Sequence, residues 1–181
     1  MIALSGISGS LIAEEPSPPP AVAGITVTKE NAFTFYRDYK RMTPKPYQVS
    51  PVISTLCSTS AAGAVKAAAK VYGPHTEARI HVYASEPATR KLDQKLAGPY
   101  AEGSVIVKEK LGPGDAVTAI GGMIKRAKGY DPEHGDWEYF FATKGGDFST
   151  GKIQNCIQCH TGAKDHDYVL DHDYVFAKWL P

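Results

Sequence analysis

The sequence lacks an excess of charge of either sign. Its 20 Lys and Arg residues nearly balance 19 Asp and Glu residues, which leaves a formal net charge of +1. Such a balance provides no polybasic surface to attract nucleic acid or an anionic membrane. We therefore expect no nucleic-acid partner, and electrostatics indicates no other macromolecular one.

Long hydrophobic runs are also missing. The apolar segment at residues 2–13 is too short and too rich in Gly and Ser to span a bilayer as it stands. It resembles the remains of an export signal without a basic start, and a stiff Pro-rich spacer follows at residues 14–20. We expect residues 1–24 to be an export-signal remnant and linker, and residues 25–181 to form the domain. A disordered leader is the alternative.

Cysteine is scarce, with three residues in the whole chain. Two of them form the sequence Cys156-Ile157-Gln158-Cys159-His160. This spacing is the one used to attach haem c, because each thiol can form a thioether with a vinyl group and the histidine can ligate the iron. The sequence therefore predicts one covalent haem c with His160 as the proximal iron ligand. Cys57 has no obvious disulfide partner, and we expect it to be a buried small side chain.

Other interpretations of the cysteine pair include a chance match, a thioredoxin-like redox pair and half of a zinc site. A redox pair normally follows an early strand, whereas this motif lies in the last quarter of the chain. A zinc site using His166 or His172 would normally show a second cysteine pair at short spacing. Residues 165–170 are nearly repeated at residues 171–176, which we interpret as a local duplication rather than a metal site. Haem attachment is therefore favoured.

Alternation of apolar and polar residues predicts several strands. In one of them Val105 and Val107 share a face, whereas Ile106 and Lys108 share the other. The predicted strands cover residues 77–84, 104–110, 116–124 and 136–143.

Helical spacing and capping residues predict helices beside these strands. Thr28 is a predicted N-cap for an amphipathic helix with an aromatic face that ends before Pro44. Ser85 caps a second helix that ends just before Gly98, and residues 61–69 form a short Ala-rich one. Successive strands with such helices predict an α+β fold, a mostly antiparallel β-sheet with flanking helices in a single haem c domain. Small electron-transfer cytochromes c are instead helical, with an early attachment motif.

Three segments together resemble the cytochrome P-460 family. They are Glu-Gly-Ser-Val-Ile-Val-Lys-Glu at residues 102–109, Gly-Tyr through Gly-Asp-Trp at residues 129–137, and the haem motif followed by Asp-Tyr-Val at residues 167–169. The resemblance covers about residues 75–170, in the same order and at compatible separations. It implies a periplasmic homodimer with an antiparallel β fold and one haem c, ligated by a proximal histidine and open on the distal side.

In that family a lysine side chain forms a further covalent bond to a meso carbon of the haem. This lysine falls on Lys108, and Lys110 is the competitor if the strand register is shifted. The resemblance implies a haem-dependent oxidoreductase that oxidises hydroxylamine or nitric oxide and passes electrons to a redox partner protein. Oxidation also requires a proton acceptor, for which His75, Glu77 and His81 are candidates. Because bacteria attach haem c outside the cytoplasm, the expected location is periplasmic or exported.

Two other functions remain open. A gas-binding protein like the beta-type cytochromes c-prime would lack the lysine bond. It would bind nitric oxide or carbon monoxide beneath apolar side chains such as those of Phe33, Phe140 or Phe148. An electron carrier would instead close the sixth coordination position of the iron with Met123 or Met42.

Overall fold

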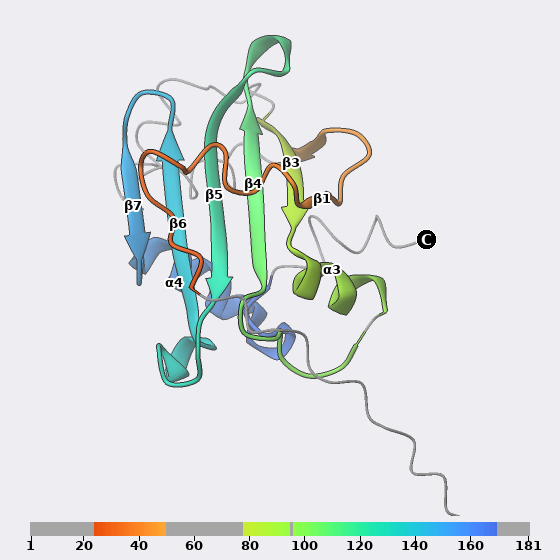
Figure 1. The fold of residues 1–181 in the computed structure, drawn as a ribbon, viewed down its shortest axis with the longest axis vertical. Coiled ribbons are helices and arrows are strands. Elements are labelled where there is room, and N and C mark those ends of the chain that lie inside the picture. The colour runs from red at the N-terminus through yellow and green to blue at the C-terminus, as the bar shows by residue number, and fades with distance from the viewer. Residues whose placement is uncertain (1–23, 50–77, 95, 170–181) are drawn as a thin grey trace, which may run out of the picture.

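An antiparallel sheet carries the other elements in the computed structural model, which describes residues 24–49, 78–94 and 96–169. Its strands follow the order β1-β3-β4-β5-β6-β7, and β2 also pairs with β3 (Figure 1). The strands are β1 (Lys40–Arg41), β2 (Tyr47–Val49), β3 (Ala78–Ala84), β4 (Val105–Leu111), β5 (Val117–Lys125), β6 (Trp137–Thr143) and β7 (Phe148–Gly151).

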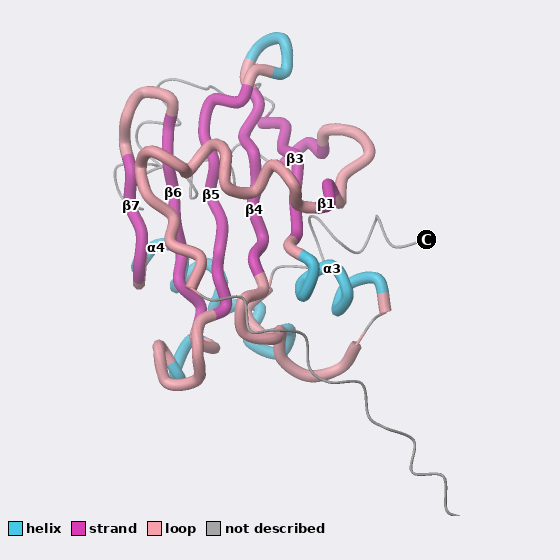
Figure 2. Tube along the Cα trace, viewed as in Figure 1, coloured by secondary structure: helices cyan, strands magenta, loops and turns pink. Residues whose placement is uncertain are grey.

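Helices are a minor part of the described chain. They are α3 (Glu86–Asp93) and α4 (Gln154–His160), with the short 3-10 segments η1 (Pro113–Asp115), η2 (Pro132–His134) and η3 (Thr161–His166). Figure 2 shows how much of the described chain is strand or loop. The predicted antiparallel sheet is therefore confirmed, while the flanking helices are shorter than the α+β description suggested.

The two faces of the sheet bury separate apolar clusters. One face, here called the α4 face, buries Ile106 and Met123 against Ile157 of α4. The other, here called the N-terminal face, buries Val105 and Val107 against the segment at residues 24–39. In Figure 1 that segment crosses in front of the sheet, and α4 lies behind it. The alternation predicted for β4 is therefore confirmed, because neighbouring residues belong to different clusters.

The predicted helix after Thr28 is wrong. Residues 29–38 form successive turns, in which the amide of Phe35 donates to the carbonyl of Asn31 four residues back but that of Arg37 donates to Thr34 three residues back. Because the ladder changes spacing, no continuous α-helix forms. Thr28 still caps the turns through reciprocal hydrogen bonds with Asn31, and the aromatic side chains pack on the N-terminal face as expected.

Helix α3 begins after Ser85 as predicted but ends at Asp93, five residues before Gly98. The hydroxyl of Ser85 does not cap the helix; it accepts a hydrogen bond of 2.8 Å from the amide of Val105. The residue that precedes the helix is thus hydrogen-bonded to the first residue of β4.

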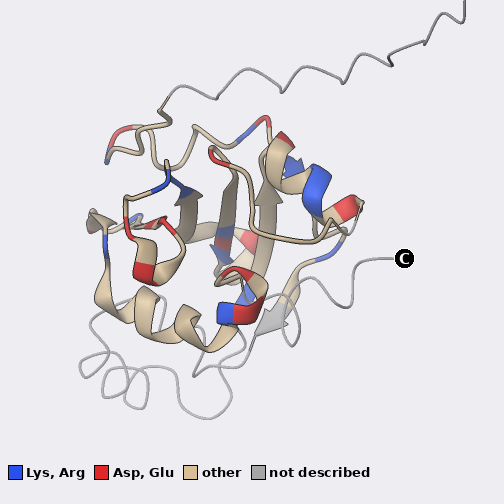
Figure 3. Ribbon diagram, turned by 90° about the horizontal axis from the view of Figure 1, so that it is seen from below, with Lys and Arg blue, Asp and Glu red and all other residues tan. Residues whose placement is uncertain are grey.

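Several predictions fall outside the described residues. They concern the leader and linker at residues 1–23, the helix at 61–69, Cys57, His75, Glu77, and the second repeat with His172. Within the described residues, basic and acidic side chains are interspersed along the elements (Figure 3). No helix of that part combines the length and hydrophobicity that crossing a membrane requires.

Candidate functional site

Helix α4 carries the whole predicted attachment motif. Cys156 and Cys159 lie three residues apart, a spacing that places both thiols on one side of a helix. Both side chains are half-buried, and Ile157 between them is only 4% exposed and packs into the α4 face. His160 is the last residue of the helix. Burial of Ile157 therefore orients the helix against the sheet, and Cys156 packs against the same cluster.

The imidazole of His160 is held by a backbone carbonyl. Its Nδ1 lies 2.6 Å from the carbonyl oxygen of Tyr168, and its ring lies 5.2 Å from that of Tyr139 between centroids. Because a carbonyl oxygen only accepts hydrogen bonds, Nδ1 carries the proton of the neutral ring. The lone pair of Nε2 is then the one available to a metal, which is the arrangement seen for ligating histidines.

Burial and a nearby positive charge keep the imidazole of His160 neutral. Burial, followed by the positive charge of Lys108, lowers the pKa of His160 to about 4, and the hydrogen bond to Tyr168 acts in the opposite direction. At neutral pH the ring is therefore unprotonated and able to act as a ligand. The same interaction shows that Lys108 lies within electrostatic reach of His160.

Lys108 is directed to the α4 face by the register of the sheet. It lies opposite Val82 of β3 and Gly121 of β5, and it shares a face with Ile106. Gly121 leaves the strand position beside Lys108 without a side chain. The nearest heavy atom to a Cβ built there lies 3.8 Å away, so no atom crowds the position. The site thus brings together Lys108 and the haem motif from segments about fifty residues apart.

Tyr139 of β6 is a residue of this site to which the sequence analysis assigned no role. Its hydroxyl is buried and has no hydrogen-bond partner among the described residues. Burial, followed by the electrostatic effect of Cys156, raises the pKa of this hydroxyl above its ordinary value. An unsatisfied buried hydroxyl beside both thiols and His160 is a group for which a bound cofactor can supply a partner.

Other residues considered from the sequence lie elsewhere. His81 is on the N-terminal face, where its Nδ1 lies 2.8 Å from the hydroxyl of Thr43, so it is not a proton acceptor at this site. Its neighbour Val82, not His81, lies opposite Lys108. The prediction for His81 was therefore wrong.

The aromatic caps proposed from the sequence were also wrong. Phe140 is buried in the cluster of the N-terminal face, and Phe33 and Phe148 pack against the same cluster. The sheet separates all three from the α4 face. Met123 does lie on the α4 face, 3% exposed, and Met42 packs against the same cluster.

A comparison with protein families bears directly on this arrangement. The family model described as Cytochrome P460 matches residues 44–171, which include Lys108 and the whole cysteine–histidine motif. The chain belongs to the cytochrome P460 family. Its members bind haem c with iron, so this protein is a haem c protein. In a comparison with curated proteins, none matches the chain.

The residues present fit the haem c of the cytochrome P460 family. Two thiols on one side of α4 are the chemistry that thioether formation requires, and the adjacent imidazole offers Nε2. The hydroxyl of Tyr139, which lacks a hydrogen-bond partner in the described part of the chain, belongs to the same site. The sequence alone identified the thiols and the imidazole. It did not identify Tyr139 or the carbonyl of Tyr168, because both join the site only through the fold.

Proposed function

We propose that the protein is a haem c oxidoreductase that acts on small nitrogen compounds, with hydroxylamine or nitric oxide as substrate. The observation that carries this proposal is the placement of Lys108 on the same face as His160, within electrostatic reach of its ring. In the members of the cytochrome P460 family that oxidise such compounds, a lysine at this position is bonded to the haem, whereas the gas-binding beta-type cytochromes c-prime lack this bond. When bound, the haem supplies the redox chemistry and the site at which the small molecule is held.

Each protein group has a distinct role in this proposal. Cys156 and Cys159 hold the cofactor through thioethers, and His160 donates Nε2 to the iron. The hydrogen bond from Nδ1 to Tyr168 keeps the ring in the tautomer that leaves Nε2 unprotonated. Lys108 would hold the haem further through its side-chain nitrogen. That bond would replace one N–H of the amine and the C–H of the haem carbon, so its formation would release two protons and pass two electrons to an oxidant such as a peroxide.

Peptide mapping tests this proposal. The protein is matured with the haem c attachment machinery, digested, and the haem-bearing peptides are identified by mass. We expect a haem joined to the peptide of residues 156–160 and also to the peptide containing Lys108, together with an optical spectrum altered by the extra bond. Lys108→Arg should remove both features, whereas the matched variant Lys110→Arg on the same strand should keep them. A haem attached through Cys156 and Cys159 alone would contradict the oxidising function.

Electron transfer is a second candidate because Met123 is buried on the α4 face, the face that also carries Lys108. A thioether ligand would close the iron and leave no position for substrate. Adding carbon monoxide to the ferrous protein separates the two functions, since an open site changes its spectrum and a closed site does not. Met123→Leu would open a methionine-ligated site and leave an open one unchanged.

Location and assembly belong to the same proposal. Haem c is attached outside the bacterial cytoplasm, so we propose a periplasmic or exported protein that forms a homodimer and passes electrons to a redox partner protein. Fractionation of cells that express the full chain, followed by measurement of the mass of the holoprotein in solution, tests location and assembly separately. Holoprotein confined to the cytoplasm would contradict the first, and a monomeric mass the second.

A further inference from the structure

The carbonyl that holds His160 belongs to a two-residue segment with an unusual backbone. Asp167 has a φ of 53° and Tyr168 a φ of 62°, so both lie in the left-handed region that residues other than glycine rarely adopt. Two consecutive residues in that region persist only where their surroundings hold them. Specific contacts must therefore hold this segment in place.

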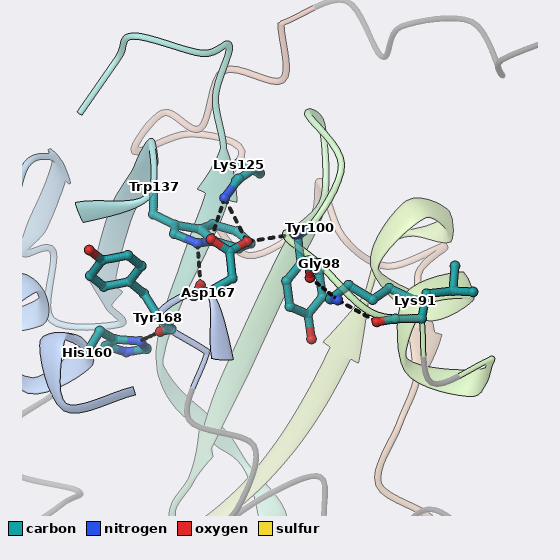
Figure 4. A network of polar contacts seen from close by, with 9 residues as sticks. Lys91, Gly98, Tyr100, Lys125, Trp137, His160, Asp167 and Tyr168 are labelled. Carbon is teal, nitrogen blue, oxygen red and sulfur yellow. Dashed lines mark hydrogen bonds and ion pairs between the residues drawn. The ribbon is translucent and has the colours of Figure 1, made fainter. Parts of the chain in front are cut away.

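Asp167 is held through both its side chain and its backbone. Lys125, at the end of β5, donates to both carboxylate oxygens at 2.7 Å, and the amide of Tyr100 donates to Oδ2 at 2.7 Å. The ring nitrogen of Trp137 on β6 donates to the Asp167 carbonyl at 2.7 Å. Figure 4 shows these groups converging on Asp167, and it shows the His160 ring in contact with the carbonyl of the next residue, Tyr168.

The ion pair between Lys125 and Asp167 is well shielded from solvent. The two side chains are 9% and 12% exposed, and the ammonium of Lys125 also lies 5.0 Å from the centroid of the Trp137 ring. Shielding strengthens such an interaction, and removal of one partner leaves the other charge buried. Tyr100 is itself supported by Lys91 of α3, whose ammonium lies 5.0 Å from the Tyr100 ring centroid.

Tyr168 is held from its other end. Its hydroxyl donates to the carbonyl of Glu133 at 2.6 Å, and its ring occupies the space that a side chain at Gly135 would fill. Both residues of the segment are thus fixed, so the direction of the Tyr168 carbonyl towards Nδ1 of His160 is fixed as well.

We propose that Asp167 and Lys125 are positioning residues: their ion pair holds the Tyr168 carbonyl against Nδ1 of His160 and so sets how strongly His160 donates to the haem iron. This inference rests on the proposed role of His160 as the iron ligand. A firm hydrogen bond at Nδ1 increases the basicity of Nε2, which favours ferric over ferrous iron. Loosening the carbonyl therefore weakens the iron–histidine bond and raises the reduction potential.

The test uses holoprotein carrying Lys125→Met, which removes the ion pair with Asp167, or Trp137→Phe, which removes the hydrogen bond to the Asp167 carbonyl. Two quantities are measured: the reduction potential and the iron–histidine stretching frequency of the ferrous protein by resonance Raman spectroscopy. We expect both variants to raise the potential and lower the frequency, and Lys125→Arg, which keeps the cation, to restore both towards wild type.

The adjacent ion pair provides a matched control. Arg126 follows Lys125 and pairs with Glu138 of β6, with side chains 20% and 14% exposed. Arg126→Met removes a similarly shielded cation without touching Asp167, so we expect the potential and the frequency to stay at the wild-type values.

The outcomes separate this inference from the proposed function. Absence of an iron–histidine band in the wild-type protein would contradict the role of His160. A band that is present but unchanged in Lys125→Met, or shifted equally in Arg126→Met, would overturn the role of the ion pair. If Lys125→Met does not fold, Asp167→Asn decides the matter, because it removes the negative charge from the ion pair and keeps a side-chain oxygen that can accept from the amide of Tyr100. An unshifted band in that variant would likewise overturn the inference.

Discussion

The hydroxyl of Tyr36 donates a hydrogen bond of 2.7 Å to the buried carboxylate of Glu109. Glu109 directly follows Lys108 on β4, so the two side chains project from opposite faces of the sheet. The acidic neighbour of Lys108 is thereby committed to the N-terminal face. Lys108 remains on the α4 face, without that carboxylate between its amine and the haem motif.

Removing the hydroxyl of Tyr36 should destabilise the protein. Burial, followed by the hydrogen bond to Glu109, raises the pKa of Tyr36, so the phenol remains a donor. In Tyr36→Phe the buried carboxylate loses this donor, and we expect a loss of about 1–3 kcal/mol in the free energy of unfolding. Urea denaturation of the holoprotein measures it.

Two variants serve as controls for Tyr36→Phe. Tyr39→Phe removes a hydroxyl from a half-buried ring packed against the same cluster, and we expect a change below about 0.5 kcal/mol. Glu109→Gln keeps an acceptor for Tyr36 and removes a buried charge, so it should be less destabilising than Tyr36→Phe. Equal stability of Tyr36→Phe and wild type would show that this hydrogen bond contributes nothing.

The same substitution at Tyr139 should behave differently. Its hydroxyl is buried with no partner among the described residues, whereas its ring packs beside His160. Tyr139→Phe keeps the ring and removes an unsatisfied group, so we expect the haem-free chain to be unchanged or more stable, by up to about 1–3 kcal/mol. Thermal unfolding of haem-free and haem-bound protein provides the measurement.

A destabilisation seen only in the haem-bound form of Tyr139→Phe would identify the haem as the partner of this hydroxyl. Destabilisation of the haem-free form would contradict the prediction, because it would mean that the hydroxyl is satisfied by the protein itself.

Gly121 and Gly122 are adjacent on β5 but should differ in how much a methyl group destabilises the protein. A Cβ at Gly122 would overlap Phe140 and the carbonyl oxygen of Ile106, and that backbone atom cannot move aside. We expect Gly122→Ala to reduce the free energy of unfolding by about 1–3 kcal/mol. A Cβ at Gly121 would make only ordinary contacts, the nearest at 3.8 Å, so Gly121→Ala should change the free energy of unfolding by less than about 1 kcal/mol. Similar unfolding midpoints for both variants would contradict the register of β5.

His81 should contribute to the acid sensitivity of the fold. Burial, followed by the positive charge of Arg41, lowers the pKa of His81 below 6.5. As pH falls, the unfolded chain therefore takes up a proton before the folded one does. The contribution of neutral His81 to the free energy of unfolding is fully present above the ordinary pKa of histidine. It is lost as the pH falls through the lowered pKa of His81 in the folded state.

His81→Gln removes this titration, so its stability should decline less than that of wild type from about pH 7.5 to about pH 5. Urea unfolding midpoints at both ends of that range make the comparison. Equal declines in the two proteins would count against a lowered pKa at His81.

Local periodicity was sufficient for the long strands. The alternation in residues 78–84 and 105–111 predicted which side chains share a face, because neighbouring residues of any strand point in opposite directions. It was insufficient for β1 and β7, which have two and four residues and carry too little pattern to detect. Aromatic spacing after Thr28 correctly predicted which side chains are buried, but it wrongly predicted an α-helix. Successive turns with mixed hydrogen-bond spacing direct the same aromatic side chains to the N-terminal face.

The sequence by itself determined the chemistry of this protein: two thiols and an imidazole at the spacing for haem c, and a lysine on an alternating strand. That information is local, because it depends on residue type and separation along a few positions. Only the tertiary structure decided which face meets α4, which excluded His81 and Phe140 from the site and placed Lys108 near His160. It also brought the Tyr168 carbonyl to Nδ1 and Lys125 to Asp167, since strand register and chain reversal depend on packing between distant segments.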